Sequence, residues 1–557
     1  MNQKETALKE SFVKENIKYV GILILIGVIL YFFQLGSMTL WDTDEALYTE
    51  IAREMQTTGD YLSTQWNYSP WFCHPPLYFW MVNLTSRVIG WNEFAARFPS
   101  AFFALLIVIL VYFMGKLLIN RKVGFLAGLI TVTTLHIWVQ ARMVLLDMPF
   151  LFFLVAAVYF FFKGFLSEKY CYYAGFWISA GFAVLTKGPV GFLLPAIYVL
   201  FYLCITRQWK RALPLLYSWG IPLFLIISVP WYWAMARIYG QPFIEQTFGY
   251  FFITRIYAPV MNQDGPWYYY IPFFLAGFLP WTPFIPFMFY FLFKKFSDYR
   301  AKFLLSWVVF TFLLFTFAGT KRPNYILFIY PGLSIALGWA MYSVFHSQKF
   351  KKSSFMSFLA FSLSTLLVIG AFILASMHYY PDYYRQYSGS LFLLAAPIIV
   401  GGIIILFLTF RNKQWAFYGI VAMTVSVCLV ITSYIPLVES LKPEPEIART
   451  IKKLEKPGDG LTMRSNFGRQ FSIIYYTQKK ANFYHSDEEL ARGLREKPGQ
   501  FVVMHRKNFD RIRDDFDMPL TIIKEKGEII LFYTGKDKSA PMQEDKGQDI
   551  NTDTQAF

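Results

Sequence analysis

The chain has 557 residues, of which 56% are hydrophobic and only 16% are charged, so an ordinary water-soluble protein is excluded and a polytopic membrane protein is indicated. The formal net charge of +16 at first suggests nucleic-acid binding. However, the Lys and Arg residues lie in short clusters between apolar runs, as the positive-inside rule expects of cytoplasmic loops. We therefore interpret the basic charge as a topology signal and expect no nucleic-acid partner. The four cysteines provide no disulfide framework.

The apolar runs predict about 13 transmembrane helices when about 20 residues are assigned to each span. The first run, residues 19–36, has no signal-peptide cleavage pattern and is expected to be retained. The expected helices centre near residues 28, 107, 131, 156, 179, 197, 224, 281, 311, 334, 365, 400 and 426. With this count every basic cluster falls on the side of the N-terminus, which is then cytoplasmic, and the C-terminus lies on the outer face. An even count would move the C-terminal domain to the cytoplasm, and the helices around residues 179 and 197 are the pair most open to another division.

An acidic stretch follows the first span. Residues 41–48 hold three carboxylates, Asp42, Asp44 and Glu45, within four positions. Ionisable groups beside a membrane span are costly, so they are usually paired, solvated or functional. From this stretch alone two interpretations have equal weight, namely a helix start capped by Asp42 or Thr43, and a catalytic carboxylate.

The segments expected on the outer face are long. Residues 39–95 contain Glu50-Ile-Ala-Arg-Glu-Met55, which has one polar and one apolar helical face, and several Trp and Tyr residues that suit a membrane interface. Residues 237–267 have a similar character. Both segments predict short helices lying on the membrane surface.

The composition changes near Glu439, which predicts a membrane domain over residues 1–438 and a small soluble α/β domain over residues 439–535. Helices are expected at 447–454, 487–494 and 509–516, and strands at 460–464, 471–477, 501–505, 521–524 and 529–534. No glycine-rich phosphate-binding loop opens this domain, and we interpret it as a lid or packing module rather than a second catalytic site. The polar residues 536–557 predict a disordered tail.

Charged and polar side chains from distant segments are predicted to lie on the outer face. They are Asp44, Glu45, His74, Arg142, Asp147, Lys187, Arg255, Lys321, Arg322 and Tyr325. Cations can hold a phosphate leaving group and a carboxylate can act as general base, which suits a transfer reaction on an anionic, lipid-borne substrate. The alternative is a set of ordinary interfacial anchors and salt bridges. Asp147 and Lys187 favour a function, because each abuts an apolar span where an unpaired charge costs roughly 2.5–3.5 kcal/mol.

An ordered series of short motifs runs through residues 15–440. The motifs are Leu40-Trp-Asp-Thr-Asp-Glu45, Glu50-Ile-Ala-Arg-Glu-Met-Gln-Thr-Thr-Gly-Asp60, Pro75-Pro-Leu-Tyr-Phe-Trp80, Glu93-Phe-Ala-Ala-Arg97, Asp147-Met-Pro149, Leu185-Thr-Lys-Gly-Pro189, Pro266-Trp-Tyr-Tyr-Tyr-Ile-Pro272, Leu279-Pro-Trp281 and Lys321-Arg-Pro-Asn-Tyr-Ile-Leu327. Together they resemble the bacterial aminoarabinose (lipid A) transferases, within the protein-O-mannosyltransferase-like superfamily of GT-C membrane glycosyltransferases. Each motif alone is weak, but their order and spacing are specific for the superfamily.

The resemblance implies an inverting glycosyltransferase of the bacterial inner membrane. Such an enzyme takes a sugar from a polyprenyl phosphate, typically undecaprenyl phosphate, to an outer-leaflet or periplasmic lipid, glycan or protein acceptor. Its catalytic carboxylates would be Asp44 and Asp147. The expected substrate-binding residues are Glu45, His74, Lys187, Arg255, Lys321, Arg322 and Tyr325.

Some positions depart from the family pattern. Cys73-His74 stands where many aminoarabinose transferases have an acid followed by Lys, Leu47 where they often have Arg, and Gln263 where they have His. In the family the acid and that His can form a metal site, which Cys73 and Gln263 do not reproduce. The motif residues thus support no metal, and the lipid-phosphate sugar is the expected donor substrate rather than a cofactor. These departures argue against assigning aminoarabinose and lipid A specifically, and affect the sugar-transfer class less.

Two other functions stay open from the sequence. A transporter or flippase for a lipid-linked sugar would also need charges in a helical bundle, but these should reach the midplane or both faces, often in repeated halves. Here they gather on one face and no internal repeat is visible, which favours the transferase. An oligosaccharide ligase or polymerase would differ by moving a chain rather than a single sugar.

Overall fold

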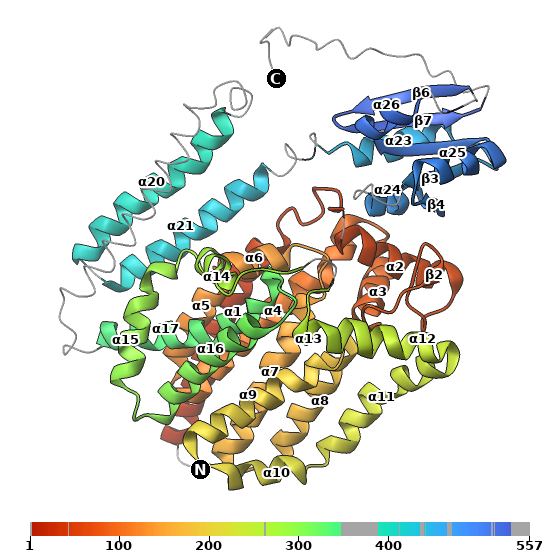
Figure 1. The fold of residues 1–557 in the computed structure, drawn as a ribbon. Coiled ribbons are helices and arrows are strands. Elements are labelled where there is room, and N and C mark those ends of the chain that lie inside the picture. Colours follow the sequence, from red (N-terminus) through yellow and green to blue (C-terminus); the bar gives the residue numbers. More distant parts are fainter. Residues whose placement is uncertain are drawn as a thin grey trace. The chain divides into compact units, whose positions relative to one another are not determined.

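The computed structural model describes residues 3–42, 44–260, 263–346, 388–411, 413–434, 439, 442–464, 470–513, 516 and 519–535 (Figure 1). The chain divides into two compact units. The first unit comprises Met1–Met38, Ile51–Trp66 and Pro70–Leu437, and the second comprises Thr39–Glu50, Asn67–Ser69 and Val438–Phe557. Helix α2 (Asp44–Thr58) begins in the second unit and ends in the first.

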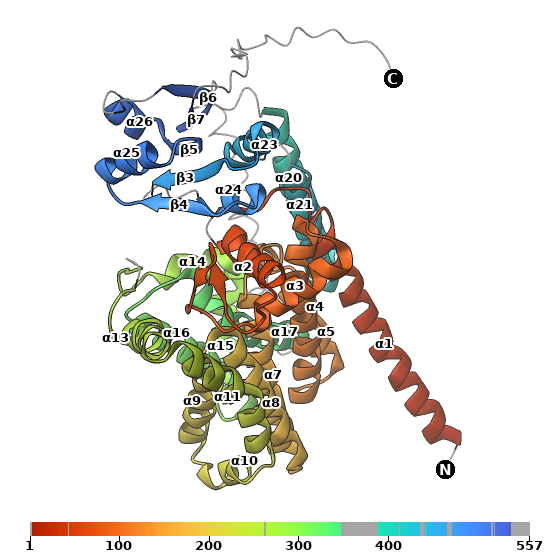
Figure 2. The same ribbon diagram turned by 90° about the vertical axis from the view of Figure 1, so that its right-hand side faces the viewer.

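The described part of the first unit is mainly helical (Figures 1 and 2). Its N-terminal half contains α1 (Gln3–Phe32), α3 (Leu77–Ile89), α4 (Glu93–Leu118), α5 (Arg121–Val132), α6 (Leu135–Ala141), α7 (Asp147–Ser167), α8 (Cys171–Lys187), α9 (Val190–Thr206), η1 (Trp209–Ala212), α10 (Leu213–Leu216) and α11 (Gly220–Tyr239). The remaining elements are α12 (Gln241–Ile244), the π-helix η2 (Glu245–Thr254), α13 (Arg255–Tyr257), α14 (Tyr270–Gly277), η3 (Thr282–Phe284), α15 (Ile285–Lys294), α16 (Tyr299–Phe317), η4 (Pro323–Phe328), α17 (Ile329–His346), α20 (Ser388–Arg411) and α21 (Lys413–Ser433). The two short strands β1 (Gln65–Trp66) and β2 (Ser69–Pro70) pair with each other.

Seven of the described helices are long and apolar enough to cross a membrane, and the number rises to nine if each of two bent pairs is one span. The bent pairs are α5 with α6, at 63°, and α14 with η3–α15, at 107°. The protein is therefore a multi-pass membrane protein. The span predicted near residue 365 lies outside the described residues. The predicted spans near residues 179 and 197 correspond to α8 and α9, which have 17 residues each and fall short of the usual length of about 20.

The bend between α5 and α6 has a local cause. The hydroxyl of Thr133 donates to the carbonyl oxygen of Leu129 at 2.6 Å, and the hydroxyl of Thr134 donates to that of Ile130 at 2.7 Å. Side-chain donors that occupy the carbonyls of the last turn compete with the next backbone N–H groups and end or bend a helix.

Two arginines donate hydrogen bonds to carbonyl groups at the C-terminal end of α1 and in the residues that follow it. Arg142 donates to the carbonyl oxygens of Leu30, Phe33 and Gln34, at 3.1, 2.9 and 3.3 Å. Arg97 donates to the carbonyl oxygens of Leu35 and Met38, at 3.0 and 2.7 Å. The last four carbonyls of a helix have no intrahelical partner, and leaving them bare is costly where water is excluded. Arg142, which sequence patterning grouped with the candidate site, is thus bound to backbone carbonyls at the end of α1 and just after it.

The second unit contains a five-stranded sheet with helices packed on it (Figure 2). The strand order is β4 (Ala481–Tyr484), β3 (Gly460–Arg464), β5 (Gln500–His505), β7 (Ile529–Thr534) and β6 (Leu520–Lys526). Strand β3 runs parallel to both β4 and β5, whereas β7 is antiparallel to β5 and β6. The helices are α23 (Glu444–Leu454), α24 (Gln470–Thr477), α25 (Asp487–Glu496) and α26 (Arg506–Ile512). Alternate residues of β5 and β7, Val502, Met504, Ile530 and Phe532, pack with apolar residues of α25 and α26 in one core.

One predicted element of this unit is wrong, and another was not foreseen. Residues 471–477 were predicted as a strand but form most of helix α24, which buries Ile473 and Ile474. A short run of aromatic and β-branched residues fits a buried strand or a buried helix equally well by periodicity. Strand β4, which has only four residues, was not predicted. The predicted tail over residues 536–557 lies outside the described residues.

Candidate active site

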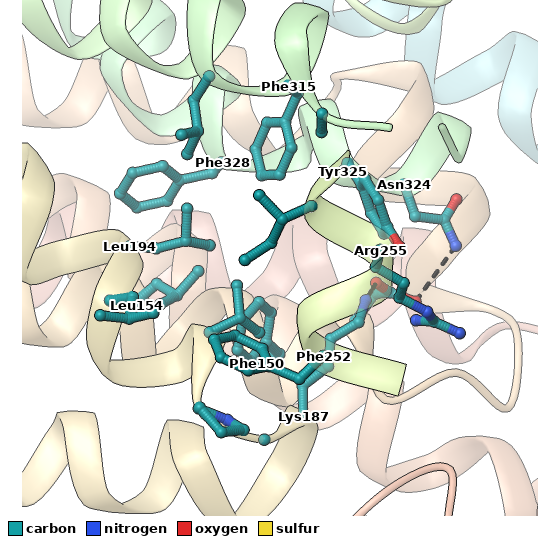
Figure 3. A pocket seen from close by; sticks show the side chains of 18 of the residues that line it. Phe150, Leu154, Lys187, Leu194, Phe252, Arg255, Phe315, Asn324, Tyr325 and Phe328 are labelled. Carbon is teal, nitrogen blue, oxygen red and sulfur yellow. Dashed lines mark hydrogen bonds and ion pairs between the residues drawn. The ribbon is translucent and has the colours of Figure 1, made fainter. Parts of the chain in front are cut away.

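A cavity of about 390 Å³ lies within the first unit (Figure 3). Most of its wall is apolar and comes from α7, the junction of α8 and α9, the π-helix η2, the end of α16 and η4. The apolar lining includes Leu151, Leu154, Leu193, Leu194, Phe252, Phe315 and Phe328. The polar lining includes Cys73, Asp147, Lys187, Thr247, Arg255, Asn324 and Tyr325. The cavity therefore joins a long apolar wall to a small group of charged and hydrogen-bonding side chains.

An ion pair occupies the polar end. Asp147 is the first residue of α7 and Lys187 is the last residue of α8, so two antiparallel helices bring opposite charges to one level. Lys187 Nζ lies 2.6 Å from Asp147 Oδ1. Both side chains are largely buried, and such a pair is sustained only when good geometry and further hydrogen bonds compensate the loss of hydration. Lys187 Nζ also lies 5.3 Å from the ring centroid of Phe150 and 5.5 Å from that of Tyr325, within cation–π range.

Two amides complete the surroundings of Asp147. Asn324 Nδ2 donates to Asp147 Oδ2 at 3.2 Å, and Gln140 Nε2 donates to Asn324 Oδ1 at 2.8 Å. Because a carboxylate only accepts hydrogen bonds, the amide nitrogen of Asn324 faces Asp147, and the Asn324 oxygen is left to accept from Gln140. Each carboxylate oxygen of Asp147 thus has its own donor, Lys187 for Oδ1 and Asn324 for Oδ2. Sequence patterning missed both amides, although Asn324 stands inside the Lys321–Leu327 motif.

Arg255 is the second cation on the cavity wall. Among the described residues it has no carboxylate partner, and its Nε is buried without a hydrogen-bond acceptor. Its backbone is fixed by the loop after α16, because Thr320 N–H donates to the Arg255 carbonyl at 3.1 Å and Gly319 N–H to that of Ile256 at 2.9 Å. A Cβ on Gly319 would stand 2.6 Å from the carbonyl carbon of Tyr257, so only glycine permits this approach. The arrangement presents an unneutralised guanidinium to the cavity.

His74 is buried between two residues, Cys73 and Pro75, that line the cavity. Its burial lowers its pKa well below the ordinary value, and the positive charges of Arg255, Lys187 and Arg322 lower it further. The imidazole is therefore neutral near pH 7 and can donate or accept a hydrogen bond without adding charge. Its ring contacts Trp71 edge-on, with centroids 5.7 Å apart.

The positions of the family's metal pair hold Cys73 and Gln263 here. Cys73 Sγ lies 3.7 Å from His74 Nε2, but within the described ranges no three His, Cys, Asp or Glu side chains gather in a way that could hold an ion. Gln263 offers an amide where the family has His, and its Oε1 is buried without a partner. These residues do not fit the family's metal pair, so no step is assigned to a metal.

The other predicted site residues are placed differently. Lys321 Nζ donates to the carbonyl oxygens of Thr316 and Ala318, at 2.7 and 3.2 Å, and so caps the end of α16. Arg322 is not part of the cavity lining. Asp44 and Glu45 begin α2 and belong to the second unit. There Glu45 is buried, and its Oε2 accepts a hydrogen bond from the Trp41 N–H at 2.9 Å.

Comparison with known proteins gives the family. Residues 16–240 match the family described as dolichyl-phosphate-mannose-protein mannosyltransferase. An uncharacterized protein of Aquifex aeolicus is 30% identical over 498 residues, which cover 88% of this chain and 91% of that protein. The chain belongs to the protein O-mannosyltransferase-like family of GT-C membrane glycosyltransferases. The resemblance inferred from the motif series is thereby confirmed, and the protein is a glycosyltransferase.

Two further relatives share almost the full length of the chain. The undecaprenyl phosphate-alpha-4-amino-4-deoxy-L-arabinose arabinosyl transferase of Enterobacter sp. is 25% identical, over 93% of this chain and 99% of its own. The crystal structure of ArnT from Cupriavidus metallidurans in the apo state aligns with a TM-score of 0.77 at 20% identity, covering 92% of this chain and 97% of that one. The structure of the same protein bound to undecaprenyl phosphate aligns with a TM-score of 0.76. The fold of this family member is therefore that of ArnT.

Proposed function

We propose that the protein transfers a sugar from a polyprenyl phosphate, undecaprenyl phosphate or a close analogue, to an acceptor lipid, glycan or protein, with inversion at the anomeric carbon. The observation that carries the proposal is the cavity of the first unit, in which a long apolar wall ends at Arg255 and the Asp147–Lys187 pair. A polyprenyl phosphate has the same two-part chemistry, an isoprenoid tail and an anionic head. The names of the arabinosyl transferase relatives and the undecaprenyl phosphate bound by ArnT support this donor class.

The two cations of the cavity, Lys187 and Arg255, differ in how available they are to bind the donor phosphate. Lys187 is already paired with Asp147, whereas Arg255 has no acidic partner among the described residues. A guanidinium can hold a phosphate through two parallel N–H donors, so Arg255 is the principal phosphate ligand in this proposal. Lys187, Tyr325 and neutral His74 would complete the phosphate site. Arg322 would contribute long-range positive charge, and Lys321 would support the wall through α16 rather than contact the donor.

The transfer step needs one base and one stabilised leaving group. A carboxylate removes the proton of an acceptor hydroxyl, or orients an acceptor phosphate, as the acceptor oxygen forms a bond to the anomeric carbon. The bond from the anomeric carbon to the donor phosphate breaks, and the phosphate leaves with the electron pair, stabilised by the cations. We assign the base to Asp44 and the second acid of the site to Asp147, with Glu45 as a structural partner at the start of α2.

The proposed topology follows the charge pattern. The chain would cross a bacterial inner membrane about 13 times, with a cytoplasmic N-terminus. The transfer site and the domain over residues 439–535 would then face the periplasm, where lipid A, another glycan or a protein is the acceptor.

The test is a comparison of envelope lipids and glycans by mass spectrometry. A deletion strain should lack one mass increment that the complemented strain carries, and that increment identifies both sugar and acceptor. Complementation with Asp44→Asn should not restore it, although the purified variant should bind undecaprenyl phosphate like the parent. If Asp44→Asn restored the increment at the parent level, the assignment of Asp44 as the base would be wrong. If undecaprenyl phosphate did not bind the parent protein, the proposed donor class would be wrong.

A further inference from the structure

The loop before α2 is tied to the C-terminal domain within the second unit. The backbone N–H and the hydroxyl of Thr39 both donate to Glu439 Oε2, at 3.1 and 2.9 Å. Lys442 Nζ donates to the carbonyl oxygen of Thr39 at 3.0 Å and lies 4.1 Å from the ring centroid of Trp41. Glu439 and Lys442 also face each other, with Nζ and Oε2 3.9 Å apart. One acid and one base of the C-terminal region thus hold Thr39 by both its backbone N–H and its carbonyl.

Asp42 makes a second set of bonds, to α24. Its Oδ1 accepts hydrogen bonds from the backbone N–H of Ser472 at 2.7 Å and from the Ser472 hydroxyl at 2.8 Å. The hydroxyl of Tyr476, one turn further along α24, accepts the N–H of Leu40 at 2.7 Å. Ser472 lies in the first turn of α24, where N–H groups lack intrahelical partners and a negative charge is favoured. Asp42 therefore caps a helix that lies 430 residues away in the sequence.

A third contact uses the edge strand β4. Asn67 Nδ2 donates to the carbonyl oxygen of Ala481 at 2.9 Å, and the Ala481 N–H donates to Asn67 Oδ1 at 2.8 Å. The side-chain amide thus pairs with the first residue of β4 as a neighbouring strand would. Asn67 has φ 52°, a left-handed conformation that Asn tolerates better than most residues. All three contacts join the first outer segment to the C-terminal domain.

We propose that the C-terminal domain acts as the positioning element for Asp44, with Asp42 and Ser472 as the central positioning residues. The proposal rests on the proposed function, in which Asp44 is the catalytic base. The three successive N–H groups of residues 39–41 are all bound, to Glu439, to the Tyr476 hydroxyl and to Glu45. Asp44 follows Asp42 by two residues, so fixing residues 39–42 fixes where α2 starts. In this proposal the C-terminal domain holds residues 39–42 in place and does not act as a lid.

A double-mutant cycle on Asp42 and Ser472 tests the proposal. The readouts are kcat and KM with the polyprenyl-phosphate-sugar fraction extracted from the deletion strain, together with binding of undecaprenyl phosphate. Displacing a catalytic group by about 1 Å can cost about a hundredfold in rate, so Asp42→Ala, which removes both bonds to Ser472, should lower kcat by about tenfold to a hundredfold. Ser472→Ala removes the hydroxyl bond but keeps the backbone N–H bond, so it should lower kcat by less. The double variant should be no slower than Asp42→Ala alone, because Asp42→Ala already removes the bond that Ser472→Ala breaks. Binding of undecaprenyl phosphate should be unchanged, since the cavity lies in the first unit.

Ser486→Ala is the matched control. The Ser486 hydroxyl caps α25 of the same domain by accepting the Glu489 N–H at 3.1 Å, so its role is to stabilise a helix other than α24. It should lower the thermal stability of the domain without lowering kcat. If Ser486→Ala lost as much kcat as Ser472→Ala, domain stability would explain the effect and the positioning role would be overturned. If the Asp42 and Ser472 variants turned over normally while Asp44→Asn was inactive, the inference would be wrong and the proposed function would stand. If Asp44→Asn was itself active, both would fail.

Discussion

Replacement of Asn324 by Leu is expected to slow sugar transfer without unfolding the protein. Leu has the branched shape of Asn but cannot donate to Asp147 Oδ2, which accepts the Asn324 amide at 3.2 Å. Asp147 is 6% exposed, so water does not readily replace the lost donor. A hydrogen bond to a buried charge contributes about 1.5–3 kcal/mol, and each 1.36 kcal/mol of transition-state stabilisation corresponds to about tenfold in rate. Because 3.2 Å is at the long end of the usual range, we expect the lower limit, about tenfold in kcat.

The substitution Asn324→Asp gives a second, pH-dependent measurement on the same contact. Two facing carboxylates cannot both ionise at low cost, so one of the pair should hold its proton to a higher pH. When protonated, the carboxyl group introduced by this substitution can donate to Asp147 as the Asn324 amide does. The activity of Asn324→Asp relative to the parent should therefore rise as the pH falls, whereas that of Asn324→Leu should stay constant.

Initial rates in detergent-purified protein, normalised to folded protein, measure both effects. Asn120→Leu is the control, because Asn120 caps α5 by accepting the Val123 N–H at 3.0 Å and does not line the cavity. It should lower thermal stability without changing kcat per folded molecule. A parent-like kcat for Asn324→Leu would refute the idea that the amide orients Asp147.

Three further predictions concern the first unit. Arg255→Gln should raise the KM for the donor by about tenfold or more, because a charge-assisted hydrogen bond contributes about that much to binding. Arg237→Gln, which changes an exposed side chain, is the control and should leave this KM unchanged. The pKa of His74 lies well below its ordinary value of 6.5, so as the pH falls below about 6.5 the unfolded state takes up this proton before the folded state does. The free energy of unfolding should therefore decrease as the pH falls. His74→Gln should weaken this decrease, as measured by the melting temperature at a series of pH values. Arg142→Leu would leave several carbonyls at the end of α1 without donors, each costing roughly 1–3 kcal/mol, and should lower the melting temperature sharply even in the presence of donor lipid. Equal melting curves for Arg142→Leu and the parent would contradict that account of the α1 terminus.

The family and the helical membrane architecture could be predicted because both depend on features that a sequence shows directly. The length of an apolar run indicates a transmembrane helix, and an ordered series of motifs indicates membership of a family. The cavity residues Asp147, Lys187, Arg255 and Tyr325 were also identified from the sequence, and the structure brings all four to one wall. Their roles in transfer remain a prediction.

The supporting contacts of the site were not predictable in the same way. Asn324 and Gln140 are neutral amides, so neither raises the cost of burial that made Asp147 and Lys187 conspicuous. Lys321 looked like a phosphate ligand because it is a cation in a motif, yet its ammonium group binds carbonyls of α16 and the loop that follows. Whether a cation faces a cavity or a helix end depends on packing between segments, which composition does not encode.

The prediction of secondary structure was wrong or incomplete where the local sequence pattern and the tertiary contacts favour different conformations. Residues 471–477 have strand-like composition, but the carboxylate of Asp42 occupies the first turn of α24 and stabilises the helix from another part of the chain. The bend after α5 depends on the hydroxyls of Thr133 and Thr134, whose choice of acceptor cannot be read from their identity. In both cases a few side-chain hydrogen bonds accompany a conformation that local propensity alone does not select.

The arginines at the end of α1 have a consequence for how the protein is made. Arg142 follows Leu30 by 112 residues, and Arg97 follows Leu35 by 62 residues. Because synthesis runs from the N-terminus, α1 is complete before either arginine is added. Until both arginines have been synthesised, the carbonyls of Leu30, Phe33, Gln34, Leu35 and Met38 lack these donors. The end of the first helix to be synthesised is thus completed by side chains that are added later, and a fragment that stops before Arg142 lacks three of these bonds.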